Sequence, residues 1–255
     1  MMYGKNLFIL IVFFAGWFSV YAQGSSGSRA RYESRYIVDM PTAGIIPKGA
    51  YSVNADIFEN GGIMTEIEAS PFSYFNMGIS FGGNNIIGGG NISWQSLPGL
   101  LLKIRIFDES KAMPAILLGF DSQGRGAYSA KRFQTMSPGI YASLSKNYSW
   151  LLGYIALHGG LNYSLEPLPV NRIPNIYFGI EQTIGKYASL NLEFNTNLDE
   201  KNHTIMKERG LFNASFRFSI IPDFTIELLG RDLMSHYVGS NGFIRTIRLE
   251  YIGKF

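Results

Sequence analysis

The chain has 255 residues, a formal net charge of +3 and no cysteine, which excludes disulfide bonds, a lipidated cysteine and thiolate metal sites. Only 16% of its residues are charged, whereas a soluble periplasmic protein usually carries more charge. Beyond residue 22, no run of 18 residues lacks a polar or charged side chain, which excludes a helical protein of the inner membrane. Nothing in the composition indicates a nucleic acid partner.

Residues 1–22 predict a cleaved signal peptide. A short positive segment ends at Lys5, an apolar run covers 7–20, and small residues up to Ala22 suit cleavage before Gln23. The apolar run has 14 residues, fewer than the roughly 20 that a membrane-spanning helix needs, so an uncleaved anchor is the less favoured alternative. The sequence therefore predicts an exported protein of a Gram-negative bacterium.

Residues 23–49 differ from the rest of the chain. They begin with glycine and serine, continue with three arginines and end in a stretch with two prolines, which predicts a periplasmic lead-in without a core of its own. Within it, residues 39–44 could dock in the periplasmic mouth of a barrel or bind a periplasmic partner. The alternative is a stiff, proline-anchored entry to the first strand.

Residues 50–255 predict a single transmembrane antiparallel β-barrel of about twelve strands, and with it an all-β protein. Short segments alternate apolar and polar residues and are separated by clusters of Gly, Pro, Asn, Asp or Ser, which is typical of strands with two different faces. The predicted strands are 50–59, 63–70, 73–83, 99–107, 114–122, 138–145, 152–163, 174–182, 188–197, 210–219, 222–230 and 243–255.

The connections between these strands favour a membrane barrel over a soluble sandwich or a lipocalin-like barrel. After the first hairpin, long and short connections alternate strictly along the chain. Outer-membrane barrels have short periplasmic turns, longer external loops and an even number of strands, so that both termini lie in the periplasm. The predicted location is therefore the outer membrane, with outer-membrane lipid as a partner.

The last strand carries a pattern that resembles the signal read by the outer-membrane barrel assembly machinery. Phe255 is the final residue, and Ile247, Leu249 and Tyr251 stand at alternate positions before it. The alternative is chance, because phenylalanine is common in this chain.

The same alternation places twelve charged residues on the inward, polar face. Charges on the lipid face would cost about 2–4 kcal/mol each at the membrane midplane, which supports this register. The set could be an ion-pair network that closes the lumen, or the lining of a solute path that weakly favours cations. The twelve are Asp56, Glu66, Glu68, Lys103, Arg105, Asp121, Glu181, Glu193, Arg217, Glu227, Arg248 and Glu250.

One acidic pair in this set is unusual. A three-residue turn at 60–62 would place Asp56 opposite Glu66 on the neighbouring strand. Two carboxylates so close could form an acid–base pair, but a cation across the lumen is the favoured interpretation.

Catalysis is not predicted. His158 is the only histidine on a predicted strand, and it faces inward near Glu181. The register sets Gly139 across from it and leaves Ser143 and Ser145 four to six residues along the strand, too far for a nucleophile at about 3.3 Å per residue. The sequence offers no metal-binding cluster and no cofactor motif.

The predicted external loop 123–137 is basic. It carries Arg125, Lys131 and Arg132 without an acid. These side chains could contact lipopolysaccharide phosphates or an anionic glycan, and the alternative is a solvated loop.

Four stretches resemble YjbH-like outer-membrane proteins, a group associated with exopolysaccharide production. The first and longest precedes the first strand, and together the stretches fall between residues 37 and 165. They are Ile37–Gly49 (IVDMPTAGIIPKG), Leu102–Ile106 (LKIRI), Pro114–Gly124 (PAILLGFDSQG) and Ser143–Asn147 (SLSKN).

The resemblance implies a barrel linked to polysaccharide secretion or cell-surface assembly, with polysaccharide as a partner. The residues alone predict a porin-like outer-membrane barrel with limited solute transport. The alternative is a structural or adhesion barrel whose ion-paired lumen is closed, and an outer-membrane hydrolase is the least favoured interpretation.

Overall fold

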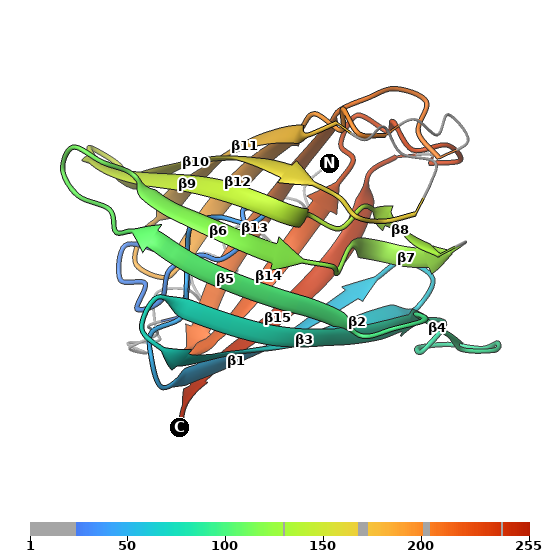
Figure 1. Cartoon of the computed structure of the whole chain (residues 1–255), viewed down its shortest axis with the longest axis horizontal. Coiled ribbons are helices and arrows are strands. Elements are labelled where there is room, and N and C mark those ends of the chain that lie inside the picture. Colours follow the sequence, from blue (N-terminus) through green and yellow to red (C-terminus); the bar gives the residue numbers. More distant parts are fainter. Residues whose placement is uncertain (1–23, 130, 168–172, 201–204, 241) are drawn as a thin grey trace, which may run out of the picture.

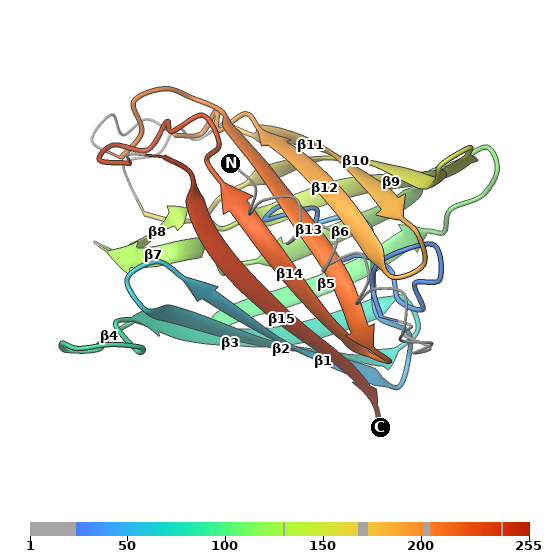
Figure 2. The ribbon, with the colours of Figure 1, turned by 180° about the vertical axis from the view of Figure 1, so that it is seen from behind.

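Twelve antiparallel strands form one closed barrel in the computed structural model, which describes residues 24–255 except 130, 168–172, 201–204 and 241. The predicted signal peptide, residues 1–22, lies outside the described residues. Each barrel strand pairs with its neighbour along the chain, and the first pairs with the last, which closes the ring (Figures 1 and 2). The part of the chain that the structure describes contains no helix able to cross a membrane.

The predicted all-β fold with about twelve barrel strands is confirmed. For eleven of the predicted strands, both ends lie within two residues of the observed bounds. The sixth observed barrel strand continues five residues beyond the predicted end. The barrel strands are β1(Ala50–Phe58), β2(Gly62–Phe72), β3(Phe75–Asn84), β5(Gly99–Phe107), β6(Ala115–Asp121), β9(Gly139–Trp150), β10(Gly153–Tyr163), β11(Asn175–Ile184), β12(Ala188–Asn195), β13(Leu211–Ile221), β14(Phe224–Arg231) and β15(Ile244–Lys254).

The three remaining strands belong to external loops. β4(Ser93–Trp94) pairs with the end of β3, and β7(Arg125–Ser129) forms a separate hairpin with β8(Arg132–Thr135). Both lie at the end of the barrel opposite the C-terminus (Figure 1). We call this end, which carries the long loops, the external end, and the end with the short turns and the C-terminus the periplasmic end.

The two faces of each strand explain why these segments form a membrane barrel. In β12, Leu190 and Phe194 are 40% and 39% exposed on the outer wall, whereas Asn191 and Glu193 are buried in the interior. Side chains alternate between the faces of a strand, so a period of two in the sequence separates a lipid-facing wall from a polar lumen. The outer wall is apolar on every side of the ring, as expected for a barrel in the outer membrane.

The sequence predicts a periplasmic lead-in before β1, but residues 34–44 of this segment lie inside the barrel, and 35–44 are buried. Both views show part of the blue segment within the ring of strands (Figures 1 and 2). We call residues 34–44 the plug hairpin. Its two arms are joined by the Tyr36–Pro41 bridge and by the bond from the Thr42 amide to the Arg35 carbonyl, 3.0 Å, and its tip is closed between Ile37 and Met40, 2.9 Å.

The core of the protein lies between this segment and the inner wall. Ala43 packs on β6 and β9, and Ile37 packs with Met40 against Tyr177 of β11. The wall leaves room because its inward residues are small: a Cβ at Gly179 would stand 2.4 Å from the Cγ2 of Ile37. A segment without sequence periodicity thus acquires its shape from the lumen that surrounds it.

Candidate functional site

The twelve charged residues that the alternation assigned to the inward face all lie in the interior. Eleven are at most 9% exposed, and the side chain of Glu250 is 15% exposed. Most of them contact either the plug hairpin or a charge on a neighbouring strand, so the lumen is filled at mid-height by an ion-paired network. The network has three parts.

The first part holds Arg35 of the plug hairpin. Its guanidinium donates to Glu68 at 2.6 Å and also binds Ser52 and Glu250. Glu68 is fully buried and has a second cationic partner, since the ammonium of Lys103 lies 3.2 Å from its carboxylate. These contacts bind the plug hairpin to β1, β2 and β15.

The second part holds Asp39 at the tip of the plug hairpin. Arg231 donates from Nε to both carboxylate oxygens at 2.9 Å and from Nη2 to Oδ1 at 2.8 Å. Arg231 also binds Asp56 at 2.8 Å, and Arg248 lies 3.1 Å from Asp56 and 3.1 Å from Glu227. Two arginines on adjacent strands therefore share two aspartates, one from the plug hairpin and one from β1.

The third part is a carboxylate held by backbone amides. Oε2 of Glu193 accepts hydrogen bonds from the consecutive N–H groups of Val38, Asp39 and Met40, at 2.9, 2.8 and 2.8 Å. Oε1 accepts a further bond from Asn213 at 2.9 Å. Successive amides that converge on one point form an anion-binding concavity, and here the barrel wall supplies the anion.

Tyr36 of the plug hairpin fills the centre of the lumen. Lys103, Arg125 and Arg248 approach its ring at 4.9, 4.6 and 5.7 Å, distances that permit cation–π attraction. Its hydroxyl lies 3.1 Å from both oxygens of Glu66. One aromatic side chain thus joins positive charges from three different parts of the barrel.

The predicted juxtaposition of Asp56 and Glu66 is wrong. The turn spans 59–61, one residue earlier than predicted, so Asp56 stands opposite Met64 and Glu66 stands opposite Asn54. Asn60 and Gly61 both adopt positive φ, the geometry that suits an Asn-Gly hairpin turn. Each carboxylate also has its own cation, as the favoured interpretation expected.

Two of the three basic residues of loop 123–137 do not face outward. Arg125 is buried and lies 3.7 Å from Glu66, and Arg132 is buried and lies 2.7 Å from Glu200. The loop folds into the β7–β8 hairpin, which turns both guanidinium groups toward acids of the interior and of a neighbouring loop. Only Lys131, at the hairpin turn, is exposed.

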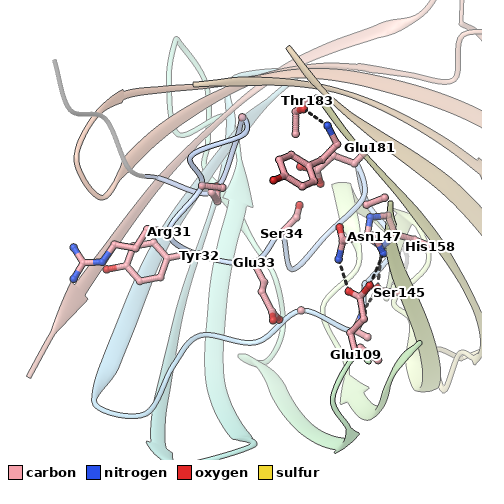
Figure 3. A pocket seen from close by; sticks show the side chains of 18 of the residues that line it. Arg31, Tyr32, Glu33, Ser34, Glu109, Ser145, Asn147, His158, Glu181 and Thr183 are labelled. Atoms are coloured by element: carbon pink, nitrogen blue, oxygen red, sulfur yellow. Dashed lines mark hydrogen bonds between the residues drawn. The ribbon is translucent and has the colours of Figure 1, made fainter. Parts of the chain in front are cut away.

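The plug hairpin divides the lumen into two hollows. The periplasmic hollow has a volume of about 570 Å³ and is bordered by Glu33, Arg105, His158 and Glu181 (Figure 3). The external hollow has about 370 Å³ and lies beneath the β7–β8 hairpin. Between them the interior holds spaces of about 20 and 10 Å³, close to the room that one water molecule takes, so the plug hairpin and its partners fill the lumen at mid-height.

The prediction that His158 lacks a nearby serine is wrong. β9 continues to Trp150, and its tight hairpin with β10 pairs His158 directly with Ser145, whose Oγ lies 2.8 Å from the imidazole Nδ1 (Figure 3). The serine oxygen is 2.9 Å from the amide of Ala43 in the plug hairpin, which donates to it. No described residue bonds to the other ring nitrogen, so the acid that would complete a catalytic triad is missing.

The residues of the predicted assembly signal lie at the end of the last strand. Ile247, Leu249 and Tyr251 lie on the outward face of β15, and Phe255 follows the strand and is 73% exposed. The described residues contain no group of three or more side chains suited to a metal ion.

Sequence reasoning missed three residues that organise the site, namely Arg35, Asp39 and Arg231. Arg231 ends β14 on the same face as Glu227, so extending the predicted strand by one residue would have found it. For Arg35 and Asp39 the only signal was their charge, since no other residue of 34–44 is charged.

No family model and no curated protein matches the chain. Among solved structures, the chain is similar to one titled "KdgM porin", with a TM-score of 0.48, 10% identity, and coverage of 79% of this chain and 98% of that one. It is also similar to one titled "NanC porin structure in rhombohedral crystal form", with a TM-score of 0.43, 9% identity, and coverage of 80% and 99%.

Proposed function

We propose that the protein is an outer-membrane channel for small hydrophilic solutes, closed by its own plug hairpin and conducting when that hairpin leaves the lumen. The observation that carries this proposal is the position of the plug hairpin: a separate segment occupies the lumen and is held there by charged side chains of the barrel wall. A segment that enters from one end of a barrel can also withdraw from that end.

The chemistry of the wall supports this proposal. Its inward side chains include many small polar residues, among them Ser52, Ser143, Ser189, Asn191 and Ser215. Such residues leave free volume and bind water once the plug hairpin has left. A barrel that is permanently closed could be filled by large apolar side chains of its own strands.

The chemistry of the plug hairpin supports it too. Arg35 and Asp39 hold the hairpin through ion pairs, and both groups regain hydration when water enters the lumen. That hydration offsets much of the lost attraction, because burying an ion pair carries a large desolvation cost. An apolar plug would have no comparable compensation on withdrawal.

The second candidate is a structural or adhesion barrel that never conducts, which the paired charges of the closed lumen also permit. Association with polysaccharide secretion, which the resemblance of four stretches between residues 37 and 165 implies, stays a prediction.

A disulfide lock distinguishes the candidates. Because the chain has no cysteine, the pair Ala43→Cys and Ser145→Cys would give a single bond between the plug hairpin and β9. In planar bilayers we expect no current from the oxidised variant and channel openings after its reduction. The reductant should not change the current of the wild type. The single-cysteine variants are the controls.

Two results would oppose the proposal. Current through a fully oxidised variant would mean that solutes bypass the plug hairpin. Silence of the wild type, of the reduced variant and of a variant with a weakened plug hairpin, all correctly folded, would favour the structural barrel.

A further inference from the structure

The outer wall of the barrel has a hollow of about 540 Å³ at its external end, where β14 and β15 meet β1. Its floor is apolar and exposed: Leu228 is 53% exposed, Phe243 is 45% exposed and Ile247 is 42% exposed. Gly230 makes room beside Phe243, whose ring would stand 3.3 Å from a Cβ at that position. The hollow is open to the surface that faces lipid.

A single cation stands at this hollow. Arg245 lies on the outward face of β15, two residues before Ile247, and its guanidinium covers the ring of Phe243 at 4.9 Å. It is exposed, and no described acid pairs with it, although Glu59 at the first turn also borders the hollow. Arginine facing lipid costs about 2–4 kcal/mol at the midplane but only about 0–1 kcal/mol near the interface, and Arg245 stands at the end of its strand.

An apolar groove that ends in an unpaired guanidinium fits a lipid with an anionic headgroup. The floor can receive an acyl chain, and a guanidinium binds phosphate through two parallel hydrogen bonds. Because the hollow lies at the external end, it faces the outer leaflet, where the phosphorylated lipid is the lipid A part of lipopolysaccharide. We propose that this hollow binds one lipid A molecule, with an acyl chain on Leu228 and Ile247 and a phosphate on Arg245.

This site differs from the one that the sequence predicted on the basic loop. Of the three loop cations only Lys131 remains exposed, so Lys131→Gln is the matched control: it removes an external positive charge without touching the hollow. The proposed lipid contacts, Leu228, Arg245 and Ile247, lie on the outer wall, whereas the plug hairpin lies inside the barrel, so binding at this site is separate from conduction. A failure of the proposed function would therefore leave this proposal standing, and the reverse holds as well.

Native mass spectrometry of the full-length mature protein tests the proposal, with lipid A and phosphatidylglycerol offered in separate experiments. We expect one lipid A per wild-type barrel, about tenfold weaker retention by Arg245→Gln, partial rescue by Arg245→Lys and no change in Lys131→Gln. Heat-modifiable mobility on gels confirms that each variant keeps its barrel.

A second measurement guards against loss of lipid in the spectrometer. In nanodiscs, lipid A should raise the unfolding temperature of the wild type and of Lys131→Gln, but not that of Arg245→Gln. Equal retention by wild type and Arg245→Gln, loss of retention in Lys131→Gln, or equal retention of phosphatidylglycerol and lipid A would each overturn the proposal.

Discussion

Replacing Asp39 by alanine should release the plug hairpin from the lumen. The buried carboxylate receives three hydrogen bonds from Arg231, at 2.8 to 2.9 Å, and Arg248 lies 3.6 Å away. No other side chain of the hairpin tip carries a charge, so the substitution removes the only ion pairs between the tip and the β14–β15 wall.

The expected magnitude follows from what Arg231 retains. Removing one partner of a buried ion pair costs about 3–5 kcal/mol when the other charge is left uncompensated. Here Arg231 keeps Asp56 at 2.8 Å and Thr246 at 3.0 Å, so the lower end, about 3 kcal/mol, applies. A change of that size raises the ratio of withdrawn to docked hairpin by about 100-fold.

Single-channel recording measures this ratio as the open probability. The matched control is Asp223→Asn, which removes the pair between Arg31 and Asp223, 3.5 Å apart with side chains 40% and 27% exposed. Such an exposed pair contributes about 0–1 kcal/mol, so the control should change the open probability less than about fivefold. If Asp39→Ala and the control behave alike, Asp39 does not hold the plug hairpin and the reasoning fails.

Three further predictions concern the plug hairpin and one external loop. Gly179→Ala places a Cβ 2.4 Å from Ile37, and such overpacking costs about 1–3 kcal/mol. Recordings of this variant should show an open probability about tenfold higher than that of the wild type. The control is Gly159→Ala, whose Cβ finds only contacts of 3.6 and 3.7 Å, and it should leave the open probability unchanged. Glu193→Gln removes the charge that accepts three backbone N–H groups and should raise the open probability about tenfold, whereas an unchanged value would mean that these bonds do not hold the tip. Burial, with Glu200 and Glu166 nearby and Arg132 opposing them, raises the pKa of Asp199 to about 7 from an ordinary value of 3.8. The charged form of Asp199 is thus disfavoured in the folded loop, and the loop loses stability as the pH rises from about 4 to about 7. Asp199→Asn should therefore slow hydrogen exchange in peptides containing this position at pH 8 and not at pH 4. Equal slowing at both pH values would contradict the raised pKa of Asp199.

The barrel was predictable because its signal is local. The alternation of residues within each strand predicts its two faces, and the turn residues between strands predict where each strand ends. β9 shows where such local reasoning stops: the sequence predicts that this strand ends at residue 145, whereas β9 continues to Trp150. That one error moved Ser145 away from His158 and hid their hydrogen bond.

The partners of the inward charges were not predictable in the same way. The alternation along a strand predicts which side chains enter the lumen. Which charges meet there depends on the tilt and stagger of the strands, and the sequence does not determine either. Asp39 and Arg231 are separated by 192 residues and meet only because a hairpin from before the first strand enters the closed barrel. The hairpin itself has no periodicity, since it belongs to no sheet and most of its side-chain bonds are made to the wall.

The charges of the plug hairpin also favour one position of the hairpin in the lumen. Arg35 and Asp39 have opposite signs and lie four residues apart; Arg35 meets the acids Glu68 and Glu250, and Asp39 meets Arg231 and Arg248. A hairpin inserted to another depth or rotated in the lumen would bring like charges together, which costs several kcal/mol. Correct insertion gains much less, because desolvation offsets most of the attraction. Charge pairing of this kind gives a plug one docked position without making that position permanent, which is what a channel closed by its own chain requires.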